Sequence, residues 1–475
     1  MAPMNDSKNP NNSSRRKFLT TSAASAFGFT FIPAYLTSAR AQDNPKLPPS
    51  QRINLGCIGV GGRGASVISG LCRGGHATPV ALCDVDHNRA SQMLKAHPDA
   101  KPFHDFREMF DKMGKDIDAV SIGTPDHTHF TAAVQAMSLG KHVYVEKPLT
   151  HTFEEAEILM RAEKKFKVVT QMGNQGHTSS GSEQFKGMLA AGVVDDIVKI
   201  EAWKSPGLWF MDAQKRIKGF PKAEAIPESL KSWELWCGPR EKKDFSSMFH
   251  SFNWRGFHLY GGGMFGDWGC HIIDFLHHYL KLGFPTEISP TALADHNQVS
   301  FPLSSHINFK FPARGEKLPA IDMTWKAGGD YVSQIDSKYL DPKAKKSPNL
   351  GGAGTLIHRK QGDYLVHRNS HGGTSKLISA KNRDDLKAAM DTKGPKFDHM
   401  ESFVQASMGH TTTESPFSVG GALTQVLNLG MIAEYLNLDL KFDPKAKRFI
   451  GNDTANALLA GAAPRKEWAG HYKLA

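Results

Sequence analysis

The chain has 475 residues, of which 40% are apolar and 22% charged, with five cysteines and a formal net charge of +11. This composition is typical of a folded protein of one or two domains, and it excludes fibrous, coiled-coil, disulfide-stapled and mostly disordered proteins. No long apolar run outside the N-terminal region could span a bilayer, which excludes a polytopic membrane protein. The basic residues are scattered and do not interleave with aromatic residues, so we expect no nucleic-acid partner.

The N-terminal residues are typical of an export signal. Residues 14–19 (SRRKFL) resemble a twin-arginine signal, a weakly apolar stretch follows at 20–36, and an A-x-A cleavage pattern ends at Ala41. A membrane anchor is the alternative, but this stretch is short for a spanning helix. We therefore expect residues 1–41 to be a signal peptide that is removed on export to the periplasm, which leaves no permanent membrane anchor.

A dinucleotide-binding motif comes next. A predicted strand at 53–58 runs into the G-x-G-x-x-G of residues 59–64, a helix-like segment follows at 65–72, and a second predicted strand at 79–83 ends at an aspartate. In this context the glycines allow a tight turn and the close approach of a pyrophosphate, which the helix N-terminus faces. The residues predicted to contact the cofactor here are Gly59, Gly61, Gly62, Arg63, Gly64 and Asp84.

Asp84 favours NAD as the cofactor over NADP. Its carboxylate would accept hydrogen bonds from the adenosine ribose hydroxyls. Beside the 2′-phosphate of NADP it would cost about 3 kcal/mol per unit charge, at a separation of ~5 Å and an effective dielectric constant of ~20. Arg63 and Arg89 would offset part of this repulsion, so NADP is the less favoured cofactor.

Strands and helices then alternate along the chain. Predicted strands lie at 118–124, 142–145 and 168–172, and predicted helices lie at 130–139 and 152–166. Such alternation over a hundred or so residues implies a parallel, doubly wound sheet.

Three motifs in this part of the chain are informative together. They are the glycine-rich loop at 59–64, a loop at 124–129 (TPDHTH) and residues 140–148 (GKHVYVEKP). They resemble the Gfo/Idh/MocA oxidoreductase family, which includes glucose–fructose oxidoreductase and inositol dehydrogenase, and the E-K-P element is the most specific mark. Asp126 is a departure, because the family loop often has asparagine at that position.

The resemblance extends through most of the mature chain. Asp267 and His271 are similar to the family's second catalytic element, which has the form D-x-x-x-H. Residues 354–363 look like its late hairpin, and residues 398–411 and 418–436 look like its two closing helices.

The resemblance implies an α/β fold with two domains. The first would be a Rossmann domain with a doubly wound parallel sheet, and the second an α+β domain with an open, mostly antiparallel sheet; the cofactor would sit on the first, with a sugar between the two. A large apolar sheet face usually marks an interface, so we expect a homo-oligomer, either a dimer or a tetramer. The predicted divisions are the signal peptide (1–41), a proline-rich linker or arm (42–51), the NAD(P)-binding domain (52–173), the substrate and oligomerisation domain (174–440) and a C-terminal extension (441–475), with an insertion or mobile loop at about 340–352.

Lys147 is the first catalytic candidate. It follows the predicted strand at 142–145, and ligands bind at the carboxyl edge of such sheets. An ammonium there can hydrogen-bond a substrate hydroxyl and stabilise the alkoxide that develops during hydride loss. An ordinary surface lysine is the alternative, which the flanking glutamate and proline disfavour. The family motif implies cofactor contacts at Thr124, Pro125, His129, Glu146 and Lys147, although His129 is equally typical of a structural histidine.

Asp267, His271 and Asp274 would share one face of a predicted helix, with His271 and Asp274 each within about 40° of Asp267. The alternative is an ordinary solvated face, but such a face usually carries Lys, Glu and Arg, which are absent here. We expect His271 to remove a hydroxyl proton and Asp267 to orient it or to hold another hydroxyl. A metal shared at i and i+4 is a further alternative; with no third ligand in view, we expect no metal site.

The sugar is expected to contact loops near these catalytic residues. Loops at strand ends are the usual place for such contacts, and a tryptophan before the glycine run could stack on a pyranose. The predicted substrate-binding residues are Asn174, Gln175, Arg255, Asp267 and His271.

Two functions fit these residues. The first is an NAD-dependent dehydrogenase that converts a ring secondary alcohol of a sugar, glycoside or cyclitol to a ketone, or the reverse. The alternative is a glycosidase that uses bound NAD in a redox-neutral cycle of oxidation, elimination, water addition and reduction. A binding protein without catalysis is disfavoured because Lys147, Asp267 and His271 are all present. An exported enzyme meets little free NAD, so we expect the cofactor to be tightly bound.

Overall fold

The computed structural model describes residues 51–475, except 208–216, 316–317, 330, 332, 337–349, 361, 380–385, 387–388 and 392–397. The predicted signal peptide, nearly all of the predicted linker and residues 340–349 of the predicted loop therefore lie outside the described residues. In the described part of the chain, no helix has both the length and the apolar character needed to cross a membrane.

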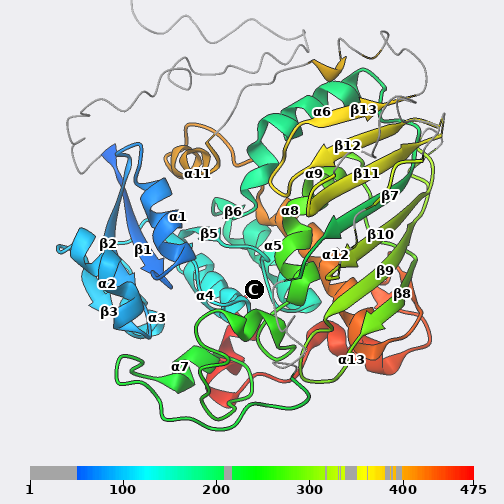
Figure 1. Ribbon diagram of the computed structural model, residues 1–475. Helices are drawn as coiled ribbons and strands as arrows, with labels where there is room; N and C mark the ends of the chain where they lie inside the picture. The colour runs from blue at the N-terminus through cyan, green and yellow to red at the C-terminus, as the bar shows by residue number, and fades with distance from the viewer. Residues whose placement is uncertain are drawn as a thin grey trace, which may run out of the picture. The chain divides into compact units, whose positions relative to one another are not determined.

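Six parallel strands form the first sheet, in the order β3-β2-β1-β4-β5-β6 (Figure 1). This is the strand order of a Rossmann fold, so the predicted fold of the first domain is confirmed. Its central strands are buried on both faces, as a parallel sheet covered by helices requires. The elements are β1 (Ile53–Ile58), α1 (Arg63–Leu71), β2 (Ala77–Cys83), α2 (His87–Ala96), β3 (Lys101–Phe103), α3 (Phe106–Met113), β4 (Ala119–Ile122), α4 (Asp126–Ser138), β5 (His142–Val145), α5 (Phe153–Phe166) and β6 (Thr170–Met172).

Helix α4 begins four residues earlier than the sequence pattern predicts. The expected loop at 124–129 is in fact the first turn of the helix, which starts at Asp126 directly after the extended Pro125. Proline fixes a backbone angle that suits the start of a helix, and an aspartate in the first turn is favoured by the helix dipole. The histidines of the motif therefore lie on a rigid helix.

The second domain is built on a nine-stranded sheet with the order β13-β12-β11-β7-β10-β9-β8-β14-β15. Only β7 and β10 pair in parallel, so the sheet is mostly antiparallel, as predicted. Its strands are β7 (Ile197–Lys204), β8 (Glu287–Ala294), β9 (Ser304–Phe311), β10 (Ile321–Ala327), β11 (Ala353–Arg359), β12 (Tyr364–Arg368), β13 (Ser375–Ile378), β14 (Leu440–Asp443) and β15 (Arg448–Phe449).

Helices cover one face of this sheet, between it and the Rossmann domain (Figure 1). They include the long α12, which packs on β8 and β9, and α6, which packs on β13. The helices of this half are α6 (Ser180–Ala190), α7 (Trp233–Cys237), a π-helical turn (Phe265–Gly269), α8 (Cys270–Ile272), α9 (Asp274–Tyr279), α11 (His399–Ser407), α12 (Phe417–Leu436) and α13 (Asp453–Ala460), with 3₁₀ turns at Gln175–Thr178, Asn253–Gly256 and Lys466–Lys473.

The other face of the sheet differs from the bare apolar surface that the sequence analysis expects. Glu201 on this face accepts hydrogen bonds from Lys326 and His358, each at 2.8 Å. Beside it, an apolar cluster around Trp203 is covered by the chain's own Ile335 and Leu350. The expected homo-oligomer was based on a bare apolar face, which the structure does not have. The homo-oligomer therefore stays a prediction.

The C-terminal residues beyond 440 are an integral part of the fold. Strand β14 adds to the large sheet beside β8, and the final 3₁₀ turn packs on α4 of the Rossmann domain. The Tyr472 hydroxyl donates a hydrogen bond to Glu155 of α5 at 2.6 Å, and Arg240 pairs with the same carboxylate oxygen at 2.7 Å. The predicted extension at 441–475 therefore joins both domains.

This buried ion pair gives a test of the docking between the domains. The Arg240 and Glu155 side chains are only 4% and 1% exposed, so Arg240→Met leaves a buried charge uncompensated and should lower the free energy of unfolding by about 3–5 kcal/mol. The matched control is Lys112→Met, because the Lys112–Glu108 pair is 64% and 49% exposed and its loss should cost no more than about 1 kcal/mol. Chemical denaturation measures both, and adding Glu155→Gln to the first variant should recover part of the loss. Equal losses in the two single variants would contradict this reading.

Candidate functional site

The glycine-rich loop between β1 and α1 has the form needed to hold a pyrophosphate. Gly59 has a φ of +72°, a conformation that favours glycine. A Cβ on Gly64 would lie 1.8 Å from the carbonyl oxygen of Gly59, so helix and strand approach more closely than any other residue allows. The loop therefore presents backbone N–H groups at the start of α1, which fits the phosphates of a dinucleotide.

Asp84 has a role at this loop that the sequence does not reveal. One of its carboxylate oxygens accepts hydrogen bonds from the backbone N–H groups of Val60 and Gly61, at 2.9 and 3.2 Å. The other accepts from the N–H of Asp86 at 3.0 Å. Asp84 thus fixes the glycine-rich loop and also lines the cavity beside it.

A cavity of about 290 Å³ lies over this loop. A segment of the second domain forms its far wall, held to the Rossmann domain by the His250–Asp86 contact at 2.9 Å and by the Lys231 N–H donating to the Val85 carbonyl. The sequence analysis misses this wall, since its only signal is a local richness in aromatic residues. The lining includes Gly59, Gly61, Gly62, Arg63, Asp84, Thr124 and Pro125 from the first domain, and Trp236, His250, Phe252, Trp254, Arg255 and Trp468 from the rest of the chain.

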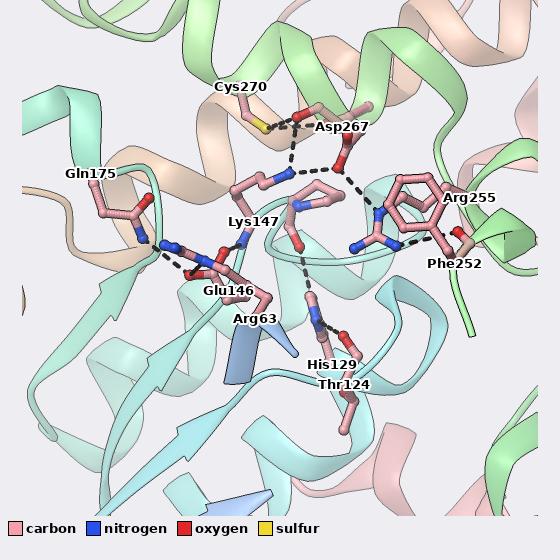
Figure 2. A network of polar contacts seen from close by, with 12 residues as sticks. Arg63, Thr124, His129, Glu146, Lys147, Gln175, Phe252, Arg255, Asp267 and Cys270 are labelled. Carbon is pink, nitrogen blue, oxygen red and sulfur yellow. Dashed lines mark hydrogen bonds and ion pairs between the residues drawn. The ribbon is translucent and has the colours of Figure 1, made fainter. Parts of the chain in front are cut away.

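Lys147 and Asp267 form the centre of the site (Figure 2). The ammonium of Lys147 donates to Asp267 Oδ1 at 2.5 Å and to the Asp267 carbonyl at 3.1 Å. Both side chains are only 13% exposed, and Arg255 Nε lies 3.5 Å from the same carboxylate oxygen. Lys147 follows β5, so the pair lies at the carboxyl edge of the Rossmann sheet, as predicted.

The charges in this pair stabilise each other. Burial would lower the pKa of Lys147, but the carboxylate of Asp267 beside it holds that pKa above its usual value. Burial would raise the pKa of Asp267, but Lys147 and Arg255 hold it below its usual value. Lys147 is therefore a cation at neutral pH, suited to stabilising negative charge on a substrate oxygen.

The predicted single helix through 267–278 is broken. A π-helical turn at Phe265–Gly269 is followed by the short α8 and α9, so a spacing of 100° per residue does not hold. Asp267 points to Lys147, whereas Asp274 pairs with His177 at 3.0 Å and is 3% exposed. The alternative of a solvated amphipathic face is wrong, because these side chains are buried.

His271 lies near Lys147, but Asp267 does not orient it as expected. Its ring instead packs on the ring of His371, with centroids 3.9 Å apart. Burial, together with the charge of Lys147, holds the pKa of His271 well below its usual value, so the imidazole is neutral. Its Nδ1 is buried without a hydrogen-bond partner among the described residues, so it is available to a substrate hydroxyl. His371 is separated from His271 by 100 positions of sequence, and no motif marks it.

The remaining predicted residues divide between ligand-facing and internal roles. Asn174 is buried, and both of its amide atoms lack partners in the described part of the chain, which fits a polar ligand. The amide of Gln175 donates hydrogen bonds to the Tyr144 hydroxyl and to the Glu146 carboxylate, so it holds the Glu146 side chain in place. Arg63 also pairs with Glu146, at 3.0 Å.

His129 is structural in this arrangement. Its ring nitrogens face the backbone carbonyls of Pro148 and Thr124, at 2.8 and 2.9 Å (Figure 2). The ring thus holds the E-K-P turn against the start of α4.

Asp126, the departure from the family loop, is a buried carboxyl group close to this centre. Its Oδ2 has no hydrogen-bond partner among the described residues. Burial raises the pKa of Asp126 to about 7, and the nearby Arg255 opposes part of that rise. Asp126 therefore carries a proton over much of the range below neutral pH. No group of three or more His, Cys, Asp or Glu side chains in the described residues is arranged to hold a metal ion.

Comparisons with known proteins agree with this geometry for the first domain. Residues 53–174 match the GFO_IDH_MocA family model, an oxidoreductase family with an NAD-binding Rossmann fold. A glycosyl hydrolase family 109 protein 2 from Shewanella sp. (strain ANA-3) is 32% identical over 161 residues, which are 30% of this chain and 35% of that protein. An inositol 2-dehydrogenase from Salmonella paratyphi B (strain ATCC BAA-1250 / SPB7) is 28% identical over 151 residues, 30% of this chain and 43% of that protein. The chain thus spans less than half the length of these curated relatives.

Solved structures show the same two-domain fold. The WlbA dehydrogenase from Bordetella pertussis, in complex with NADH and UDP-GlcNAcA, superposes with a TM-score of 0.57 and 13% identity, over 82% of this chain and 99% of that chain. A levoglucosan dehydrogenase in complex with NADH gives a TM-score of 0.54 and 17% identity, over 81% of this chain and 97% of that chain. At such identities the likeness shows the fold alone.

The titration of Asp126 gives a test of its buried position. Its pKa is raised on folding, so the folded state binds the proton more tightly than the unfolded state, and stability falls as pH rises from about 4 to about 7. The asparagine in Asp126→Asn does not ionise, so the stability of this variant lacks this decrease with rising pH. The gain in unfolding free energy of the variant over the parent should be about 2 kcal/mol larger at about pH 8 than at about pH 5.

The control for this experiment is Asp111→Asn, since Asp111 is exposed. Urea denaturation at the two pH values measures both variants. A gain for Asp126→Asn that is the same at both pH values would show that the carboxyl group is ionised throughout or solvated.

Proposed function

We propose, from a first domain that matches an NAD-binding oxidoreductase family, that the chain is an NAD-dependent oxidoreductase acting on a sugar, glycoside or cyclitol. It would convert a ring secondary alcohol to a ketone, or the reverse. The observation that carries the proposal is the Lys147 ammonium, held by Asp267 at the carboxyl edge of the Rossmann sheet, where Arg255 contacts Asp267 and also lines the cavity over the glycine-rich loop. When bound, NAD supplies the acceptor for the hydride that leaves the alcohol carbon.

Four side chains have separate roles in the proposed reaction. Lys147 hydrogen-bonds the reacting oxygen and stabilises the negative charge that develops on it. Asp267 positions Lys147 and keeps it charged. The unpartnered Nδ1 of the neutral His271 accepts the hydroxyl proton, and Asn174 offers a donor and an acceptor to neighbouring hydroxyl groups. This division fits a polyol, because each buried polar atom without a partner is one that a hydroxyl can satisfy.

We propose NAD rather than NADP as the cofactor, because the carboxylate of Asp84 disfavours a 2′-phosphate. We also propose that the cofactor is resident. The cavity is walled by both domains, so a bound dinucleotide would be covered along much of its length, and release would require the His250–Asp86 contact to open. A resident cofactor suits the proposed export to the periplasm, where free NAD is scarce.

The glycosidase alternative keeps the same residues and the same first step. Relatives named as glycosyl hydrolase family 109 proteins support it. Oxidation acidifies the neighbouring C–H, the leaving group departs, water adds and the ketone is reduced again, so the cycle consumes no oxidant. Incubating the protein with aryl glycosides in deuterated water separates the two readings, because only the cycle releases aglycone and places solvent deuterium on the carbon next to the oxidised one.

Lys147→Met tests the proposed reaction. The variant should retain the fold and the dinucleotide but lose about 10²-fold or more in kcat, since the lost interaction acts on charge that develops in the transition state. Turnover is followed as ketone formation over a panel of sugars and cyclitols. The control is Lys141→Met, at the opposite end of β5, which should leave kcat unchanged. Retention of more than about a tenth of kcat by Lys147→Met would refute the role of Lys147.

A further inference from the structure

Lys204 is a buried cation that the reaction above does not use. It is the last residue of β7 and is only 8% exposed. Along β7 it alternates with Ile200 and Ala202, so it points to the face of the sheet that the helices cover. A buried ammonium is costly unless an opposite charge or a full set of hydrogen bonds compensates it.

The compensation that Lys204 finds in the chain is incomplete. Its Nζ donates one hydrogen bond, to the Pro206 carbonyl at 2.9 Å, and lies 4.7 Å from the ring centroid of Trp268. Among the described residues no carboxylate lies within ion-pair distance of it. Burial lowers the pKa of Lys204, as expected for an ammonium without an anionic neighbour.

The other cations of the site are balanced within the chain. Arg63 pairs with Glu146, and both Lys147 and Arg255 pair with Asp267. Lys204 therefore differs from these three in having no carboxylate partner among the described residues.

Trp268 connects Lys204 to the proposed catalytic residues. It directly follows Asp267 in the π-helical turn, and its indole Nε1 is buried without a partner in the part of the chain that the structure describes. Its other neighbour is His371, whose ring lies 6.3 Å from that of Trp268 and packs on His271. His371 is exposed, so this row of side chains begins at the surface.

We infer that Lys204 and Trp268 form a subsite for an anionic oxygen group on the substrate, so that the preferred substrate is an acidic sugar, such as a hexuronic acid, and not a neutral one. The inference rests on the proposed function and specifies its substrate class. The ammonium and the indole N–H are both donors, and a carboxylate offers two acceptor oxygens. The ammonium is a compact single positive charge, which one carboxylate neutralises.

The test compares a hexuronate, the corresponding neutral hexose and its phosphate ester as substrates of the holoenzyme. The hexuronate should have the lowest KM. Lys204→Met should raise that KM by about 10- to 100-fold, the usual effect of losing a hydrogen bond to a charged group, with little change in kcat and little change for the neutral hexose. Lys204→Arg should recover part of the affinity.

Lys199→Met is the matched control, because Lys199 lies on the same strand but is 46% exposed on the opposite face. It should leave the KM for every sugar unchanged. Ligand binding is also followed by thermal unfolding, where the hexuronate should stabilise the parent protein but not Lys204→Met.

The outcomes separate the inference from the proposed function. A neutral hexose oxidised with the lower KM, or a hexuronate KM that Lys204→Met leaves unchanged, would overturn the subsite and leave the dehydrogenase standing. A preference for the phosphate ester that Lys204→Met abolishes would keep the anionic subsite but reject the carboxylate. Stabilisation by hexuronate that depends on Lys204, without oxidation of any sugar, would support the subsite and reject the oxidoreductase.

Discussion

The ion pair between Lys147 and Asp267 is the interaction on which the site depends. One partner follows strand β5 of the Rossmann sheet, and the other lies in a π-helical turn of the second domain. Both side chains are largely buried, so neither charge would be stable there without the other. The pair therefore requires the two domains to be docked, and docking in turn brings His271 near Lys147 and forms the far wall of the cavity over the glycine-rich loop.

Local motifs in the sequence predict the first domain well. The glycine-rich loop, Asp84 and the E-K-P turn each depend on a few adjacent residues, and the structure places all of them at one sheet edge. The mostly antiparallel second sheet could be expected only from the family resemblance, because its strand order joins segments that are far apart in the chain. Even within a motif, the start of α4 is shifted, since one proline and one aspartate outweigh the loop-like appearance of the TPDHTH sequence.

The candidate site is only partly predictable from the sequence, because a break in a helix and long-range packing decide which residues meet there. Helical periodicity groups Asp267, His271 and Asp274 on one face, but the π-helical turn sends each to a different partner. Residues such as His371 and Trp236 reach the site through long-range packing, and no spacing rule detects that. Asp84 lines the cavity over the glycine-rich loop and Gln175 contacts Glu146, yet part of each role is to hold other site residues, which becomes visible only from hydrogen-bond geometry.

The central claim is that a hydride passes between a ring carbon of the substrate and a dinucleotide held over the glycine-rich loop. The most direct measurement incubates the protein and its dinucleotide with sugars and glycosides deuterated at their ring carbons, then releases the dinucleotide by denaturation and examines it by NMR. We expect deuterium at C4 of the nicotinamide ring, in the parent protein and not in Lys147→Met. A dinucleotide that is bound but stays undeuterated with every acidic and neutral substrate would contradict the dehydrogenase. In the glycosidase cycle the deuteride returns to the sugar, so that alternative is contradicted when, in addition, no glycoside releases its aglycone.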